Sequence, residues 1–174
     1  GVGPTLTIAM DTTGSMGSII DGAKEQAIQI VNARIGTPEE PSKYILAPFS
    51  DPTVPTPFIT TNPDQFKSAI SSLTAAGGGD CPELSMTGLL KGLSASDEGG
   101  TIYLFTDASA KDSALASKVS SLAHKKDIQI YPLLFGSCSP FDPAYSAVAD
   151  NSGGQVFFLS TSEASSVTKL ADFL

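Results

Sequence analysis

The segment Asp11-Thr12-Thr13-Gly14-Ser15 places one carboxylate and two hydroxyls at alternate positions, directly after the apolar run 6–10. A helical pattern begins near Ile19, so these side chains lie on a loop where a predicted strand turns into a helix. Hard divalent cations such as Mg²⁺ take oxygen ligands in near-octahedral geometry and keep several waters. One carboxylate with two neutral hydroxyls therefore makes an open coordination sphere that can accept a ligand from outside the protein.

Strand-like apolar runs alternate with helical patterns along the rest of the chain. Buried strands are predicted over residues 6–10, 44–49, 101–105, 128–135 and 155–159, and a short edge strand forms a hairpin at 58–60. Helices are predicted over residues 20–35, after Asn62-Pro63, from Pro82 onward, around 115–122, at 145–149 and over 162–174. This alternation predicts an α/β fold with a doubly wound, mostly parallel six-stranded sheet, one antiparallel edge strand and helices on both faces.

Ligands of such sheets bind beyond the carboxyl ends of the strands, near the point where strand order reverses. The acids that follow strands or open helices on this edge are Asp11, Asp51, Asp80, Glu83 and Asp107. Each hydroxyl or carboxylate could instead cap a helix or close a turn, because Ser, Thr and Asp satisfy free N–H groups there. Capping alone predicts neither the alternate spacing nor the further acid-bearing loops, so a metal site is the preferred interpretation.

Three segments carry a family resemblance. Asp11-x-Thr13-x-Ser15 resembles the metal-ion-dependent adhesion site of von Willebrand factor type A domains, a Rossmann-like family, and the whole chain reads most like the A domain of hemicentin-type extracellular proteins. Gly79-Asp80-Cys81-Pro82-Glu83 is similar to the Asp-x-Pro-Glu loop of integrin β I-like domains, and Phe105-Thr106-Asp107-Ala108 to the strand end that carries a third metal-site acid. The resemblance implies Mg²⁺ or Mn²⁺ held by Asp11, Thr13, Ser15 and Glu83, with Asp107 beside the metal.

The integrin-like loop also implies a possible second site. In that class, the aspartate, the proline carbonyl and an aspartate of the second-strand loop hold a neighbouring Ca²⁺. Carried over to this sequence, the second site comprises Asp51, Asp80, Pro82 and Glu83. The chain departs from the pattern at Gly78, where the family has an asparagine, and the region offers no metal-binding threonine. Acids for a third site are missing at Ser18 and Ile19, so none is predicted.

Two cysteines, Cys81 and Cys138, lie in loop-like settings, and the sequence alone does not decide between free thiols and a bridge. Because hemicentin-type A domains have cysteines in both loops, the resemblance implies a Cys81–Cys138 disulfide, which favours an oxidising compartment. The expected location is therefore extracellular or at the cell surface.

Bulk properties restrict the other classes of function. The chain of 174 residues fits one domain spanning 1–174, and no linker divides it. Its formal net charge of −8 repels nucleic acid and anionic lipid. No apolar run is long enough to cross a bilayer, so no membrane insertion is expected. The chain reads as an excised part of a larger multidomain protein.

The preferred hypothesis is therefore a binding module, not an enzyme: a bound metal completes its coordination with an acidic side chain of a partner protein. The alternative is a haloacid-dehalogenase-type phosphotransferase with Asp11 as nucleophile, whose motif also begins at the end of a first strand. That alternative needs a paired-acid loop, but Asp142 and Asp150 are scattered. A serine hydrolase is weaker, because His124 is the only histidine and lies at a predicted helix end.

Overall fold

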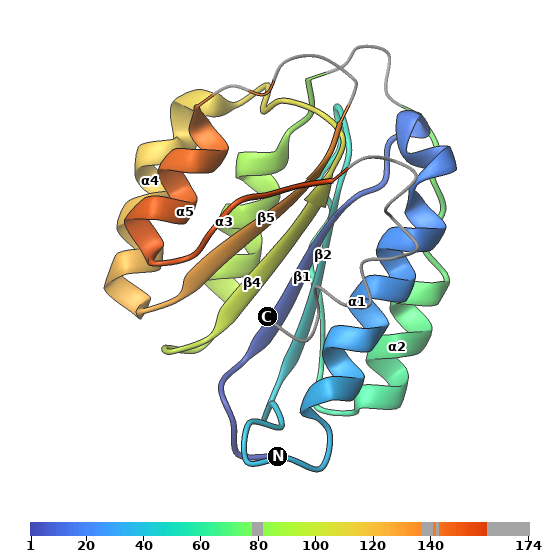
Figure 1. The fold of residues 1–174 in the computed structure, drawn as a ribbon, viewed down its shortest axis with the longest axis vertical. Helices are drawn as coiled ribbons and strands as arrows, with labels where there is room; N and C mark the ends of the chain where they lie inside the picture. Colours follow the sequence, from blue (N-terminus) through green and yellow to red (C-terminus); the bar gives the residue numbers. More distant parts are fainter. Residues whose placement is uncertain (78–81, 137–140, 142, 160–174) are drawn as a thin grey trace.

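The computed structural model describes residues 1–77, 82–136, 141 and 143–159. Its sheet has six strands in the order β3-β2-β1-β4-β5-β6 (Figure 1). The strands are β1 (Leu6–Asp11), β2 (Tyr44–Phe49), β3 (Phe58–Thr60), β4 (Thr101–Thr106), β5 (Gln129–Phe135) and β6 (Phe157–Leu159). All neighbouring pairs are parallel except β2 with β3. The predicted mixed sheet with one antiparallel edge strand is confirmed.

The helices are α1 (Ile20–Arg34), α2 (Pro63–Ser71), α3 (Ser85–Ala95), α4 (Ala116–Lys126) and α5 (Ala144–Ser152). Short 3-10 turns, η1 (Gly14–Ser18) and η2 (Ser113–Leu115), precede α1 and α4. At α2, the Asn62 side chain accepts hydrogen bonds from the N–H groups of Asp64 and Gln65, as its position before Pro63 predicts. Within the described residues, no helix is both long and apolar enough to span a bilayer.

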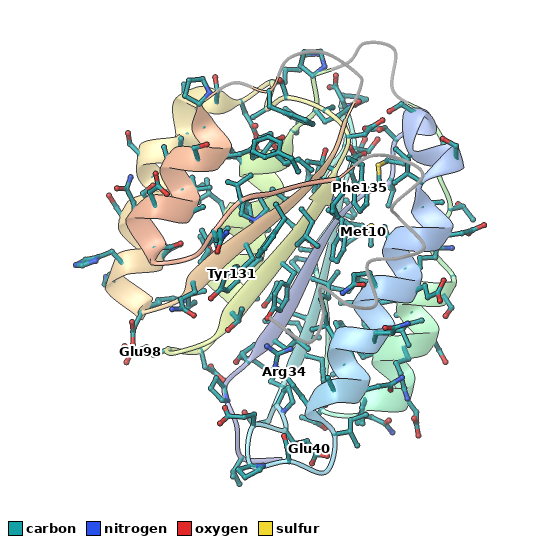
Figure 2. All side chains as sticks on the ribbon, in the orientation of Figure 1. Met10, Arg34, Glu40, Glu98, Tyr131 and Phe135 are labelled. Carbon is teal, nitrogen blue, oxygen red and sulfur yellow. The ribbon has the colours of Figure 1, made fainter. Side chains whose placement is uncertain are left out.

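Two hydrophobic cores lie on opposite faces of the sheet. Figure 1 shows α1 and α2 on one face and α3, α4 and α5 on the other. Alternate strand residues point to the two faces, so Met10 and Phe135, labelled in Figure 2, pack in the core with α1. Ala9 and Leu134, one position away in each strand, pack in the core with α3 to α5. The near-continuous burial of β1 and β4 reflects this double coverage.

Helix α3 packs against β2 at Gly88, where a larger residue would not fit without a shift. A Cβ atom added at Gly88 would stand 2.8 Å from the ring of Phe49, so even alanine would require a shift. The helix begins at Ser85, not at Pro82 as predicted, because Glu83 is held in an isolated parallel bridge with Ala110. Helix α3 therefore begins only after this bridge.

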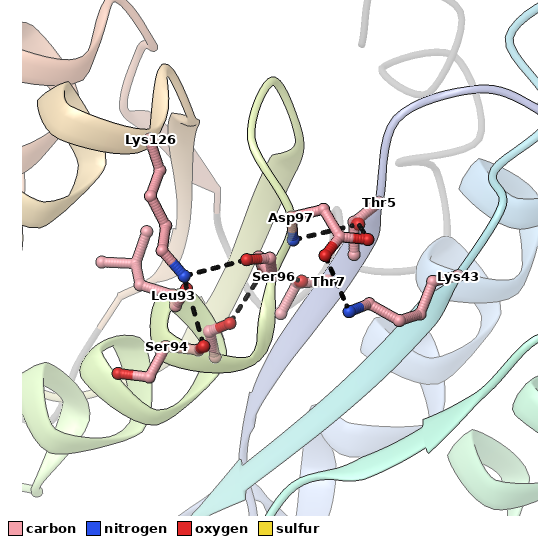
Figure 3. A network of polar contacts seen from close by, with 9 residues as sticks. Thr5, Thr7, Lys43, Leu93, Ser94, Ser96, Asp97 and Lys126 are labelled. Carbon is pink, nitrogen blue, oxygen red and sulfur yellow. Dashed lines mark hydrogen bonds and ion pairs between the residues drawn. The ribbon is translucent and has the colours of Figure 1, made fainter.

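A polar network holds the amino-terminal end of the sheet (Figure 3). The Lys126 ammonium, in the last turn of α4, donates to the carbonyls of Leu93, Ser94 and Ser96 at 2.8, 3.2 and 2.9 Å. These carbonyls lie at the end of α3, where the helix dipole favours a cation. Asp97 forms an ion pair with Lys43 at 3.2 Å at the same end of the sheet.

The remaining differences from the predicted elements lie at their ends. Helix α5 extends to Ser152, beyond the predicted 149, and β6 begins at Phe157 rather than 155. The predicted terminal helix over 162–174 lies outside the described residues.

Candidate metal centre

The candidate centre lies where β1 and β4 end, at the carboxyl edge of the sheet. These neighbouring strands run parallel, and Met10 pairs with Phe105. The next residues, Asp11 and Thr106, are therefore also neighbours, and Asp107 follows directly. After β1 the chain adds β2 and β3 on one side of it and β4, β5 and β6 on the other. The edge between β1 and β4 is therefore the switch point at which α/β sheets bind ligands.

Asp11, Thr13, Ser15 and Asp107 are brought together by a chain of side-chain hydrogen bonds. The Thr13 hydroxyl donates to Asp11 Oδ1 at 2.6 Å and lies 3.3 Å from Ser15 Oγ. The Ser15 hydroxyl donates in turn to Asp107 Oδ1 at 3.1 Å. Asp11, Thr13 and Asp107 are buried, whereas Ser15 is exposed. The group therefore opens to solvent at Ser15.

Thr106 completes the support of Asp11. Its hydroxyl donates to Asp11 Oδ2 at 2.7 Å, while Oδ1 also accepts from the backbone N–H of Thr13 at 2.9 Å. Both oxygens of the buried carboxylate are thus held in place. No local motif in the sequence points to Thr106, although the register of two parallel strands with polar ends could have indicated it.

The electrostatics of the centre oppose a second negative charge. Burial, the nearby Asp11 carboxylate and a hydrogen bond with it raise the pKa of Asp107 from 3.8 to about 6, and the hydrogen bond from Ser15 only partly offsets this. A divalent cation among these oxygens would relieve the repulsion between the carboxylates. Hydroxyls that donate to carboxylates in this arrangement also carry lone pairs that can serve a metal.

Ordinary helix capping does not explain the hydroxyls. Thr13 is the N-cap residue of η1, and Ile19 that of α1, yet neither position has a side-chain cap hydrogen bond. Asp107 is also more than a local turn residue, because its partner Ser15 lies 92 positions earlier in the chain.

Backbone hydrogen bonds fix the loop that carries the two hydroxyls. The N–H of Thr12 donates to the carbonyl of Phe49 at the end of β2, at 3.0 Å. The Thr12 carbonyl accepts from Ala76, and the N–H of Gly14 donates to Gly77, each at 2.9 Å. A Cβ atom at Gly14 would lie 3.0 Å from the Gly77 carbonyl oxygen. The loop after β1 is therefore joined to β2 and to the chain that follows α2.

Glu83 lies on the neighbouring loop and is buried at 1 % exposure. Its N–H donates to the carbonyl of Ser109 at 2.9 Å, and its carbonyl accepts from Lys111 at 2.7 Å, so it is placed beside the segment that follows Asp107. Among the described residues, however, no group of three or more His, Cys, Asp or Glu side chains is arranged to hold one ion. The carboxylate pair at the centre is Asp11 with Asp107, and a metal role of Glu83 stays a prediction.

Asp112 anchors this segment to α3. Its Oδ1 accepts from the N–H of Met86 at 3.0 Å, and its Oδ2 accepts from the N–H and the hydroxyl of Thr87, both at 2.6 Å. This is an N-terminal helix cap supplied by a residue distant in sequence. This cap was not predicted from the sequence, because local capping patterns do not reveal a partner on another loop.

The predicted second site is only partly described. Asp51 follows β2 and its Oδ2 lies 2.6 Å from the Lys111 ammonium. Pro82 is half-buried beside Glu83. Asp80 lies outside the described residues, as do Cys81 and Cys138, so the second site and the disulfide both stay predictions.

Comparisons with known proteins agree with this architecture. A family model described as von Willebrand factor A domain matches residues 5–161. The chain is 39% identical over 168 residues to von Willebrand factor A domain-containing protein 7 of Rattus norvegicus, covering 88% of this chain and 19% of that protein. It is 35% identical over 170 residues to hemicentin-1 of Mus musculus, covering 95% and 3%. The chain thus spans a small part of these relatives.

Solved structures show the same fold. The SpRpn10 VWA domain superposes with a TM-score of 0.71 at 17% identity, covering 97% of this chain and 95% of that one. Proximal thread matrix protein 1 from the mussel byssus, in a structure with a zinc-occupied MIDAS motif, gives 0.66 at 18% identity, covering 98% and 47%. Together, the family model, the relatives and the sheet order establish that this chain belongs to the von Willebrand factor A domain family.

Proposed function

We propose that this domain is a metal-dependent protein-binding module that captures an acidic side chain of a partner. Asp11, Thr13, Ser15 and Asp107 would hold a divalent cation, with Mg²⁺ or Mn²⁺ as the preferred ions, because the donors are carboxylate and hydroxyl oxygens. The bound cation would act as a Lewis acid centre for an incoming carboxylate. Glu83 is proposed as a further acid near the metal.

The observation that carries the proposal is the pair of buried carboxylates held by hydroxyls, of which that of Ser15 belongs to an exposed residue. Burial and the neighbouring Asp11 carboxylate together raise the pKa of Asp107, so a negative charge on both groups is unfavourable. A structural role alone gives no reason to retain two such groups at the switch point of the sheet. A cation between them offsets the repulsion, and a coordination position left open by the protein ligands can accept a carboxylate oxygen from outside.

The residues favour binding over turnover. Ser15 has no histidine base beside it, because His124 is at the end of α4, and Lys126 in the same turn meets the opposite end of the sheet. The location we propose is extracellular or at the cell surface, within a larger multidomain protein, in keeping with the small share of each relative that the chain covers.

Calorimetry with Mg²⁺, Mn²⁺ and Ca²⁺ tests the proposal. The parent should bind one of these ions, and Asp11→Ala should abolish that binding, because the carboxylate that both hydroxyl-bearing loops hold in place would be lost. Thr106→Val should lower the affinity about tenfold, since it frees the Asp11 carboxylate to rotate.

Thr12→Val provides the matched control. Its hydroxyl donates to the Phe49 carbonyl at 3.2 Å rather than to Asp11, so the metal affinity should be unchanged. A phosphatase assay on the parent runs beside these titrations. Metal affinity that survives in Asp11→Ala, or metal-dependent release of phosphate by the parent, would refute the binding-module proposal.

A further inference from the structure

The Asp51–Lys111 ion pair lies at the same edge of the sheet as the metal centre but takes no part in it. Asp51 follows β2, and Lys111 lies on the segment after β4, 60 positions later in sequence. The Asp51 side chain is 13% exposed and the Lys111 side chain 43%. The carboxylate is therefore largely removed from water, whereas the ammonium is reached by solvent.

Backbone hydrogen bonds fix the position of Lys111, from which its side chain extends to Asp51. Its N–H donates to the Glu83 carbonyl at 2.7 Å, next to the parallel bridge between Glu83 and Ala110. Asp112 then caps α3 from the following position. Because the residues on both sides of Lys111 are held in place, only its side chain has to be ordered for the ammonium to contact Asp51 at 2.6 Å.

A divalent ion at Asp51 would have to displace this contact. A charge-assisted hydrogen bond to a carboxylate is among the stronger ones in proteins, and a nearby ammonium also repels a second cation. As long as Lys111 holds this contact, the Asp51 carboxylate is therefore not available to a resident Ca²⁺.

We propose that Lys111 is a tethered cation that takes the place of a second divalent ion beside Asp51, so that the domain binds metal at Asp11 and not at Asp51. This inference rests on the proposed function of the Asp11 centre. It assigns Lys111 to metal selectivity: the lysine compensates the Asp51 carboxylate without any dependence on the Ca²⁺ concentration.

The test is a Ca²⁺ titration by calorimetry, in saturating Mg²⁺, of the parent and of Lys111→Met. Removal of the ammonium leaves Asp51 without this cation, so Lys111→Met should show a Ca²⁺ binding event that the parent lacks. The double variant Lys111→Met with Asp51→Asn should lose that event again. Lys111→Arg, which keeps the positive charge, should behave as the parent does.

Lys91→Met is the matched control, because Lys91 also reaches the loop after β2 but donates to the backbone carbonyl of Val54 rather than to a carboxylate. It should gain no Ca²⁺ event. An Asp51-dependent event in the parent, or no gained event in Lys111→Met, would overturn the inference. Failure of the proposed function is distinct: it appears as the absence of Mg²⁺ binding sensitive to Asp11→Ala, whatever happens at Asp51.

Discussion

The two ends of the β-sheet differ in how their charged side chains are paired. At the amino end, Lys126 meets three carbonyls and Lys43 meets Asp97, so each cation faces acceptors (Figure 3). At the carboxyl end, Asp11 and Asp107 are held close together by hydroxyl donors, and the pKa of Asp107 is raised. The first arrangement stabilises the fold, whereas the second lowers stability at the place where we propose that a cation binds.

Lys126→Met should give the largest loss of stability, because it removes the cation that joins α4 to the end of α3. It removes a charge-assisted contact with three carbonyls at the end of α3, so we expect the free energy of unfolding to fall by about 2 kcal/mol. Chemical denaturation with and without Mg²⁺ measures the unfolding free energy and, from the difference between the two, the Mg²⁺ affinity. The Mg²⁺ affinity should not change, and a loss of affinity as large as the loss of stability would contradict the separation of the two ends.

Asp107→Asn should act in the opposite sense in metal-free protein. The folded state raises the pKa of Asp107 from 3.8 to about 6, so ionisation of this group lowers the unfolding free energy. This loss of stability is absent below pH 3.8 and is complete above about pH 6. The variant carries no such cost and should exceed the parent in unfolding free energy by about 1–2 kcal/mol above pH 6.

Two further readouts sharpen this prediction. The difference in unfolding free energy between the Asp107→Asn variant and the parent should shrink as the pH falls toward 4, measured in the presence of a chelator. The same variant should bind Mg²⁺ about tenfold or more weakly, because a carboxylate is lost from the centre. A variant that is less stable than the parent at pH 7 would show that Asp107 serves the fold rather than the metal.

Lys43→Met should give the smallest effect. Asp97 is largely exposed in its ion pair with Lys43, and water and salt screen such pairs. We expect a loss of no more than about 0.5 kcal/mol in unfolding free energy, disappearing at high salt. A loss comparable with that of Lys126→Met would mean that the Asp97 pair, and not the capping of α3, dominates the amino end.

Most of the fold was predictable from sequence because its strands are apolar runs of the right length and its helices carry periodic apolar faces. The strand that ends at Asp11 and the Asn62 cap of α2 follow from such local rules. The position of Asp107 at a strand end is equally local, and strand adjacency then brings it to Ser15.

Pairings between distant loops could not be predicted in this way. The bridge from Glu83 to Ala110 delays the start of α3, and the contact of Lys111 with Asp51 fills a position at which a metal ligand was expected to be available. Neither leaves a mark in the local pattern of residue types. Thr106 is intermediate, because the strand register that joins it to Asp11 can be inferred once β1 and β4 are known to be neighbours.

The long separation of the partners at the metal centre has a consequence for how the domain folds. Ser15 and Asp107 are 92 positions apart in sequence, and Asp11 and Thr106 are 95 apart. Contacts of such high sequence separation are slow to form, because the chain must lose the entropy of closing a long loop before the contacts stabilise it. The four side chains meet only when β1 and β4 are already paired. Appearance of the proposed metal affinity during refolding should therefore report the late pairing of β1 with β4.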